Sequence, residues 1–314
     1  MKWIGSHSVF APAEKTFAER VVHSINKAIE NTELSLSDGQ TALIISSTKG
    51  EDLDLIKPSS QVAEILHYPN TPIVVSNACT SGVCAQIVAA RLLQSKQYKA
   101  VVVTGCDLIT EFIRSGFDVL HALSKNPARP FDIARDGLNL GEAVATMVFV
   151  DDNHPSESPC WHYESGSIHN DANHISGPSR TGEGSYLCLQ DVLKDTTIDT
   201  IAMIGLHGTG TLYNDEMESI AIHRAGLDQI PVNSFKGGYG HTLGAAGLLE
   251  TILCLHSLEK GIIPSTKGYE TQGTTYSLSV SSEERYFIPY KGMQFIKLLS
   301  GFGGTNAAVR YKWQ

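Results

Sequence analysis

The segment from Thr71 to Gln94 limits the possible folds more than any other part of the chain. It reads TPIVVSNACTSGVCAQIVAARLLQ, with a short β-branched run, a Ser-Asn-Ala-Cys corner and then Ala, Val and Leu residues at helical spacing. This order predicts a strand, a tight turn and a helix. Cys79 stands at the turn, directly before the predicted helix.

The position of Cys79 has a chemical consequence. Its sulfur would lie near the unpaired N–H groups and the positive dipole end of the following helix, which favours the thiolate over the thiol. The thiolate is the form that attacks carbonyl carbon. The alternative interpretation is a small core residue, because most free cysteines are buried and inert.

The other predicted elements indicate an α/β protein. The apolar run at 98–104 is typical of a strand buried on both faces, and such strands belong to parallel sheets covered by helices. Residues 231–255 repeat the order of the first segment, with His241 entering its helix much as Cys79 does. This similarity fits two related halves packed together. The polar stretch at 151–159 is the best candidate for a boundary between them.

Composition excludes several classes of function. Among 314 residues, 42% are hydrophobic and 18% are charged, which is typical of a globular protein. The net charge of -9 and the lack of a basic stripe argue against nucleic acid as a partner. The chain starts without the apolar core of a signal peptide and has no bilayer-length apolar run, so we expect a cytoplasmic protein without membrane contact. The six cysteines lack disulfide-framework spacing, and we expect reduced thiols.

Two histidines are embedded in glycine and threonine. His207 lies in HGTGT and His241 in GHTLGAAG. Glycine allows the backbone to approach a ligand closely and threonine adds small hydrogen-bonding groups, although each histidine could also be an ordinary core or surface residue. Lys236 and Glu250 are close to His241 in sequence and could fix its orientation and charge, or could form a surface ion pair.

Several common motifs are missing from the sequence. Gly238, Gly240 and Gly244 do not have the GxGxxG spacing of dinucleotide-binding loops, and no GxxxxGK[ST] phosphate loop occurs. The GxSxG elbow of serine hydrolases is missing too. The cysteines and histidines lack zinc-ligand spacing, so we predict neither a metal site nor a cofactor-binding site. One long polar and aromatic connection, 105–142, remains, and such loops are usually functional.

Five motifs in one order resemble the β-ketoacyl synthases, in the elongating branch that uses one cysteine and two histidines. The motifs are NACTSG around Cys79, RPFDIARDG at 129–137, HGTGT at 207–211, KGGYGHTLGAAG at 236–247 and GFGGTNAA at 301–308. A thiolase would carry a second catalytic cysteine where this chain has Phe302, and a priming synthase would carry asparagine in place of His241. Only 78 residues precede Cys79, so the N-terminal segment is shorter than in most elongating synthases.

The resemblance implies a thiolase-like fold of five layers, αβαβα, with mixed sheets in two similar halves. Residues 1–151 would form the half with the nucleophile and residues 152–314 the half with the two histidines. The implied reaction is decarboxylative condensation of an enzyme-bound acyl thioester with malonyl-acyl carrier protein, in fatty-acid or polyketide-type synthesis, including polyene synthesis. The implied partners are acyl carrier protein and a second subunit, in a homodimer or in a heterodimer with another ketosynthase-like chain. No cofactor is implied beyond the phosphopantetheine arm that delivers the substrate.

The resemblance also implies a role for each matching residue. Cys79 would take the acyl group, while His207 and His241 would bind the carbonyl of the malonyl thioester. Phe302 would gate the pocket, and its N–H would join that of Cys79 in an oxyanion hole. The remaining implied residues are Lys236 and Glu250, which support the site, Thr209 and Thr211 along the pantetheine arm, and Gly304 and Thr305 as substrate contacts.

Two other functions fit part of the sequence. The short N-terminal segment is compatible with an accessory subunit that shapes the pocket of a full-length synthase, although such chain-length-factor-like partners commonly lose the nucleophile that this chain keeps. A cysteine hydrolase of another fold would need only Cys79 and one histidine. That function leaves HGTGT, GHTLGAAG and GFGGTN unexplained.

Overall fold

The computed structural model describes residues 1–9, 16–152 and 159–314. The first half contains strands β1 (Lys2–Val9), β2 (Thr41–Ser46), β3 (Ile73–Val75), β4 (Ala100–Asp107) and β5 (Ala143–Val150), with helices α1 (Phe17–Ile29), α2 (Ile56–Ile65), α3 (Ser81–Gln94) and α4 (Glu111–Val119). The second half contains strands β6 (Trp161–Asn170), β7 (Ile201–Gly205), β8 (Val232–Asn233), β9 (Ile262–Ile263), β10 (Arg285–Tyr286), β11 (Gln294–Gly301) and β12 (Thr305–Trp313). Its helices are α5 (Glu183–Val192), η1 (Ile198–Thr200), α6 (Leu212–Arg224), α7 (Lys236–Tyr239), η2 (Leu243–Ala245) and α8 (Ala246–Glu259).

The large sheet consists of two half-sheets with the same topology. The strand order is β3-β2-β4-β5-β1-β6-β12-β11-β7-β8. In the first half-sheet β3, β2 and β4 are parallel, and β5 and β1 follow antiparallel. The second repeats this pattern, with β8, β7 and β11 parallel and β12 and β6 antiparallel. The half-sheets meet where β1 pairs with β6 through Lys2 and His162. The structure therefore confirms the prediction of two similar halves with mixed sheets.

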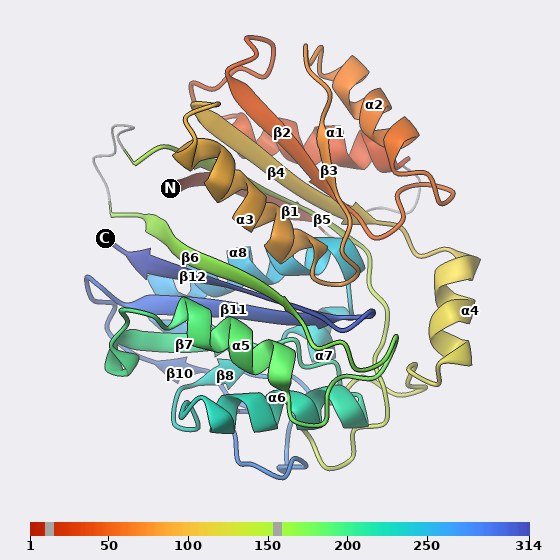
Figure 1. Ribbon diagram of the computed structural model, residues 1–314, viewed down its shortest axis with the longest axis vertical. Coiled ribbons are helices and arrows are strands. Elements are labelled where there is room, and N and C mark those ends of the chain that lie inside the picture. The colour runs from red at the N-terminus through yellow and green to blue at the C-terminus, as the bar shows by residue number, and fades with distance from the viewer. Residues whose placement is uncertain (10–15, 153–158) are drawn as a thin grey trace.

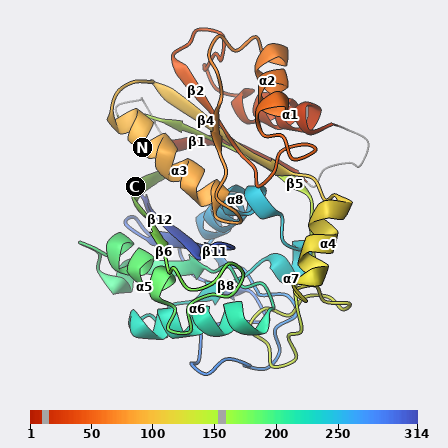
Figure 2. The same ribbon diagram turned by 45° about the vertical axis from the view of Figure 1, so that its right-hand side comes forward.

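Helices complete the five layers that the resemblance implied. Helix α1 covers the outer face of the first half-sheet. Helix α5 covers the outer face of the second half-sheet, and α6 packs against α5. Between the half-sheets lie α3 and α8, each of which contacts strands of both halves. Figures 1 and 2 show these two helices side by side in the middle of the molecule. The order of layers is α, β, α, β, α.

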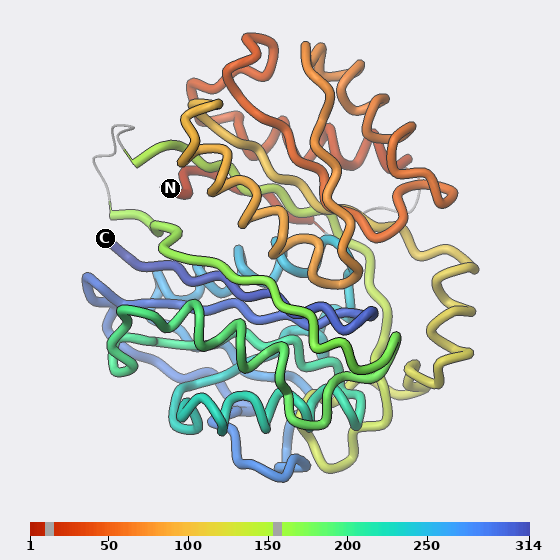
Figure 3. The backbone as a smooth tube through the Cα atoms, viewed as in Figure 1, coloured from red at the N-terminus to blue at the C-terminus, as the bar shows by residue number. Residues whose placement is uncertain are grey.

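Three apolar cores fill the spaces between the layers. The central core joins α3 and α8 to both half-sheets, and separate cores lie under α1 and under α5 with α6. Strands β4, β5 and β11 are almost continuously buried, because helices cover both of their faces. Figure 3 shows that the backbone of β6 runs next to both chain ends; Tyr163 N–H donates to Met1 (2.9 Å) and Cys160 N–H to Gln314 (3.0 Å).

The segment 105–142, predicted as one long connection, contains helix α4. Thr110 caps this helix, because its side chain accepts from the N–H of Ile113, and Glu111 lies in the first turn, where an acidic side chain favours the helix dipole. The predicted boundary at 151–152 stays a prediction, since β5 ends at Val150 and residues 153–158 lie outside the described part. In the part of the chain that the structure describes, no helix has the length and apolar character needed to span a membrane.

Candidate active site

The corner that carries Cys79 has a strained backbone held by side chains. Ala78 has φ of 46°, a left-handed conformation that residues with a side chain rarely adopt. The N–H of Asn77 donates to the Ser81 hydroxyl (2.8 Å), and the Thr80 hydroxyl donates to the carbonyl of Asn77 (2.7 Å). These bonds place Cys79 two residues before α3, as predicted, with its side chain buried.

The structure brings together the three side chains that were expected to meet. The sulfur of Cys79, one ring nitrogen of His207 and one ring nitrogen of His241 lie within 4.8 Å of one another. The two imidazole rings are 5.0 Å apart between centroids and nearly perpendicular, at 82°. Cys79 comes from the first half, while His207 follows β7 and His241 follows α7 in the second half. All three line a cavity of about 480 Å³.

The same cavity is lined by every residue predicted to contact substrate. These residues are Thr209, Thr211, Phe302, Gly304 and Thr305. The Thr209 and Thr211 hydroxyls are 2.9 Å apart, and the Thr305 hydroxyl accepts from the side-chain amide of Asn77 (2.8 Å). The ring of Phe302 packs on that of Phe117 of α4, 5.3 Å away between centroids. Helix α4 therefore forms one apolar wall of the cavity.

The ionisation of Cys79 differs from the sequence-based prediction. Burial raises the pKa of its thiol to about 12, even though Lys236 and the N–H groups of Phe302 and Cys79 act in the opposite direction. The prediction of a resting thiolate is therefore wrong, since loss of solvent outweighs the helix start. The N–H groups of Phe302 and Cys79 nevertheless face the sulfur, where they could hold an oxyanion.

Both histidines are neutral near pH 7. Burial lowers the pKa of His207 and of His241 well below the usual value, and the positive charges of Lys236 and Lys297 lower both further. The Nδ1 atom of His241 accepts from the N–H of Leu243 (3.3 Å), which places the ring proton on Nε2. This Nε2 atom is buried without a partner among the described residues, and His241 lines the cavity. It is therefore a hydrogen-bond donor available to a substrate oxygen.

Lys236 and Glu250 pair behind the histidines, outside the lining of the cavity. Their charged atoms are 2.5 Å apart, and Lys297 of β11 contacts the other oxygen of Glu250, also at 2.5 Å. Burial alone would raise the pKa of Glu250, but the two ammonium groups outweigh it and the pKa is lowered. The cluster thus carries one net positive charge beside the imidazoles. Lys297 was not among the residues predicted from the sequence, although a lysine inside the apolar strand FIKLLS was a signal.

Two buried carboxylates of α6, also missed, hold the HGTGT loop. Glu218 accepts from the N–H groups of His207 (2.6 Å) and Gly208 (2.7 Å), and Asp215 accepts from those of Thr209 (3.0 Å) and Gly210. Burial raises the pKa of Glu218 to about 7, with a further contribution from the charge of Asp215. The available signal was the acidic run NDEMES directly after the loop.

Asp107, at the end of β4, connects the two halves near the site. Its carboxylate accepts from the Ser47 hydroxyl (2.7 Å) and from the N–H of Gly244 (2.7 Å), just before α8. This contact fixes the turn that follows His241 against the half that carries Cys79. Asp107 could not be predicted from the sequence, because its partner Gly244 lies 137 residues away in the chain.

The chain is similar to known proteins over most of its length. The family model described as β-ketoacyl synthase, N-terminal domain, matches residues 31–153, and that for the C-terminal domain matches residues 163–270. A 3-oxoacyl-[acyl-carrier-protein] synthase 2 of Vibrio cholerae serotype O1 is 30% identical over 277 residues, 83% of this chain and 66% of that protein. A putative mitochondrial 3-oxoacyl-[acyl-carrier-protein] synthase of Schizosaccharomyces pombe is 27% identical over 280 residues, 81% of this chain and 64% of that protein. The chain thus spans just under two thirds of the length of these curated relatives.

Solved structures show the same fold at lower sequence identity. The ishigamide ketosynthase/chain length factor superposes with a TM-score of 0.85 at 22% identity, over 97% of this chain and 84% of that one. A ketosynthase in complex with its chain length factor from Xenorhabdus doucetiae gives 0.84 at 24% identity, over 98% of this chain and 85% of that one. The thiolase-like fold is thereby confirmed. Because the two domain models together match most of the residues, the chain belongs to the β-ketoacyl synthase family.

Proposed function

We propose that the chain is an acyltransferase of the 3-oxoacyl-acyl carrier protein synthase type. It would condense an acyl group on Cys79 with a malonyl unit in fatty-acid or polyketide-type synthesis. The observation that carries this proposal is the meeting of one sulfur and two neutral imidazoles within 4.8 Å at the wall of a cavity. A nucleophile and two donors are the groups that acyl transfer followed by decarboxylation requires.

The first step transfers the acyl group to Cys79. The sulfur attacks the carbonyl carbon of an acyl-pantetheine thioester, a new C–S bond forms, and the bond to the pantetheine sulfur breaks. Because burial raises the pKa of Cys79 to about 12, its proton has to leave during the attack. A neutral imidazole can accept this proton and pass it to the departing pantetheine sulfur. The N–H groups of Cys79 and Phe302 hold the oxyanion of the intermediate.

The second step joins the malonyl unit to the acyl group. The carbon–carbon bond to the malonyl carboxylate breaks, CO₂ leaves, and the electron pair forms an enolate whose oxygen accepts from His207 and His241. The enolate carbon then attacks the thioester carbon on Cys79, and cleavage of the C–S bond releases the lengthened chain and leaves a thiolate on Cys79, which takes up a proton from water. Burial keeps both imidazoles neutral, and the positive charges of Lys236 and Lys297, which Glu250 holds in place, lower the pKa of both rings further. Removal of one hydrogen-bond donor to the enolate oxygen, here His207 or His241, typically lowers the rate about 100- to 1000-fold.

The cavity wall supports a carrier-bound substrate. The paired hydroxyls of Thr209 and Thr211 offer hydrogen bonds to the amides of a pantetheine arm. The N–H of Phe302 points to the Cys79 sulfur and its ring packs on Phe117 of α4, so a change of its side-chain rotamer would widen the cavity between them for an acyl chain. We assign Gly304 and Thr305 to contact with the thioester, since both line the cavity beside Phe302. The carrier is acyl carrier protein, and the arm brings the only prosthetic group that the reaction uses.

We further propose that the chain works as a dimer, either with itself or with another ketosynthase-like subunit. Two of the similar solved structures are described as a ketosynthase with a chain length factor. An accessory role is the second candidate function. The retained sulfur, both imidazoles and a formed cavity favour the catalytic role.

The test is acyl transfer from an acyl carrier protein that bears a radiolabelled acyl group. The wild type is expected to become labelled and Cys79→Ala to stay at background, because alanine cannot form the thioester. Cys84→Ala is the matched control, since Cys84 is a buried cysteine of α3 whose loss leaves the nucleophile in place. Equal labelling of the wild type and Cys79→Ala would overturn the proposal. Labelling that requires a co-purified ketosynthase partner, and that persists in Cys79→Ala of this chain, would establish the accessory role.

A further inference from the structure

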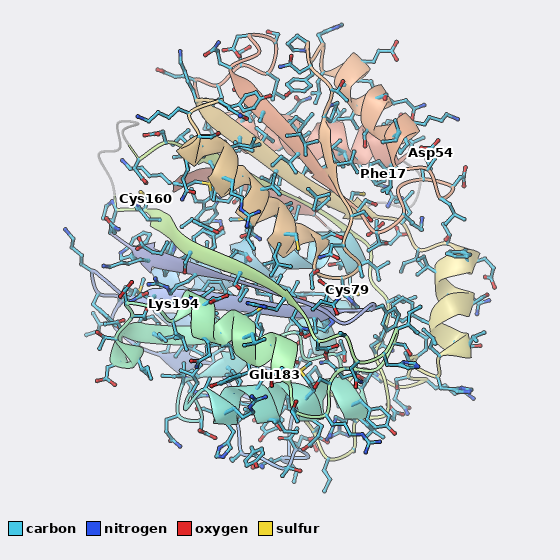
Figure 4. The ribbon with its side chains drawn as sticks, in the orientation of Figure 1. Phe17, Asp54, Cys79, Cys160, Glu183 and Lys194 are labelled. Carbon is cyan, nitrogen blue, oxygen red and sulfur yellow. The ribbon has the colours of Figure 1, made fainter. Side chains whose placement is uncertain are left out.

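A second thiol lies at the start of β6, away from the proposed active site. All six cysteines are among the described residues; five are buried and Cys160 is half-buried. Cys160 lines a separate cavity of about 550 Å³ with Trp3, Trp161 and His256. Figure 4 shows Cys160 at one end of β6, well apart from Cys79. The strand extends about 30 Å from Trp161 to Asn170, and it is the far end that borders the first cavity.

Cys160, His162 and Asp152 form a chain of contacts from thiol to imidazole to carboxylate. Its sulfur lies 3.5 Å from Nε2 of His162, and Nδ1 of His162 lies 3.1 Å from a carboxylate oxygen of Asp152. Because a carboxylate only accepts, the ring proton of neutral His162 lies on Nδ1 and Nε2 is the acceptor that faces the thiol. A nucleophile, a base and a group that orients the base, at these distances, form the usual arrangement of an activated thiol.

Other charged groups face this chain of contacts from each neighbouring element. The Met1 amine contacts Asp152 (2.8 Å), and His162 is paired in register with Lys2 of β1 and Lys312 of β12. The cavity wall adds Glu33, His256 and Glu259. Burial lowers the pKa of His162, Asp152 raises it, and the Met1 amine and Lys2 lower it again. His162 is therefore neutral near pH 7 and able to accept a proton.

The backbone around Cys160 distinguishes its chemistry from that of Cys79. The N–H of Cys160 donates to the carbonyl of Gln314 (3.0 Å), so it is not available to hold an oxyanion. At Cys79, by contrast, the N–H of the cysteine and that of Phe302 face the sulfur. Acyl transfer needs such donors, whereas exchange with a disulfide needs only a thiolate in line with the S–S bond.

We propose that Cys160 is a modification site for thiol–disulfide exchange with a low-molecular-weight disulfide bound in this second cavity. The Cys160 sulfur attacks one sulfur of the disulfide as its proton passes to Nε2 of His162. A new S–S bond forms between the protein and half of the reagent, and the old S–S bond breaks. The other half leaves as a thiolate and takes the proton from His162, so no further oxidant is consumed. Asp152 is a positioning residue, because it holds the tautomer of His162 and touches no reacting atom.

The experiment measures mixed-disulfide formation at Cys160 with oxidised glutathione, quantified by peptide mass spectrometry from about pH 6 to about pH 10. An unassisted thiol with a pKa of about 8.5 is only a few per cent thiolate at pH 7. We therefore expect His162→Gln to react about tenfold more slowly than the wild type at pH 7 and equally fast at pH 10, where either thiol is ionised. Asp152→Asn should show a smaller loss with the same dependence on pH.

The control is His223→Gln, the same substitution in another histidine–aspartate pair, where His223 Nδ1 lies 2.8 Å from Asp228. This variant should retain the wild-type rate at Cys160 at every pH. Equal rates of His162→Gln and the wild type at pH 7 would overturn the proposal. The wild-type profile is decisive even if His162→Gln fails to fold, because a midpoint at the ordinary thiol value of about 8.5 excludes an assisted thiol. Mixed-disulfide formation at other cysteines in preference to Cys160 would overturn the proposal too.

Discussion

The corners before α3 and α8 have the same architecture but carry different chemistry. The first follows the short strand β3 directly, and the second follows the short strand β8 with α7 between them. Each helix has glycine at its second position, Gly82 and Gly247. The two glycines face each other, since a Cβ on Gly247 would lie 2.5 Å from the backbone nitrogen of Val83. Cys79 stands two residues before its helix, whereas His241 stands five residues before its own, with η2 between. The sequence similarity had suggested equivalent places.

This offset explains why the two side chains have separate roles. At the start of α3 the sulfur lies next to its own N–H, in a place suited to an attacking atom and an oxyanion. The additional turn at η2 moves the imidazole back from α8, and its Nδ1 accepts from the N–H of Leu243, which has φ of 53°. The fifth residue of each helix differs as well, since it is Ala85 in α3 and Glu250 in α8. One corner thus carries the thiol that we propose as the nucleophile, and the other carries an oriented imidazole donor next to a buried ion cluster.

The largest loss of stability is expected from neutralising Glu250, which is charged in α8 where α3 has Ala85. Glu250→Gln leaves Lys236 and Lys297 buried without a counter-ion, and loss of one partner of a buried pair typically costs about 3–5 kcal/mol. Urea unfolding should show this loss in the free energy of unfolding. Glu259→Gln, the same change at the more exposed end of α8, is the control and should have little effect. A similar small change in both variants would show that the cluster is not needed for stability.

An intermediate effect is expected from disturbing the contact between the two helices. Gly247→Ala places a methyl group against the backbone of Gly82 and Val83, and overpacking of this kind typically costs about 1–3 kcal/mol. Gly82→Ala should cost less, because its nearest neighbours would lie at 3.0 Å. Thermal unfolding of the two variants measures the difference. A larger loss from Gly82→Ala would contradict the geometry of this contact.

The smallest signal is expected in the alkylation of Cys79 by iodoacetamide, whose rate should be low near neutral pH. Because burial raises the pKa of this thiol to about 12, little thiolate is present at pH 7. The rate of reaction with iodoacetamide should rise about tenfold per pH unit, without a plateau, up to about pH 10. Peptide mapping would follow Cys79 apart from the other cysteines. A plateau of the alkylation rate near or below pH 8.5 would show that the start of α3 influences the thiol pKa more than burial does.

The sequence predicted those features that depend on local pattern. The strand, turn and helix around Cys79 could be predicted from periodicity, and the two histidines stood out by their glycine and threonine neighbours, while the five-layered fold was implied by the family resemblance of the motifs. Lys297 and Asp107 could not, because each is defined by a partner on a distant segment, Glu250 and Gly244 respectively. The ionisation of Cys79 was predicted wrongly for a related reason. The helix start is visible in the sequence, while the burial that outweighs it arises only from packing.

The seam between the half-sheets has a consequence for how this protein can lose activity. Among the described residues, β1 and β6 are in register at Lys2 and His162, and the proposed site takes its sulfur from one side of the seam and its imidazoles from the other. A slight rotation of one half-sheet against the other would separate these groups while each layer kept its own secondary structure. The proposed activity would then be lost before the protein melts, while circular dichroism would still show native secondary structure.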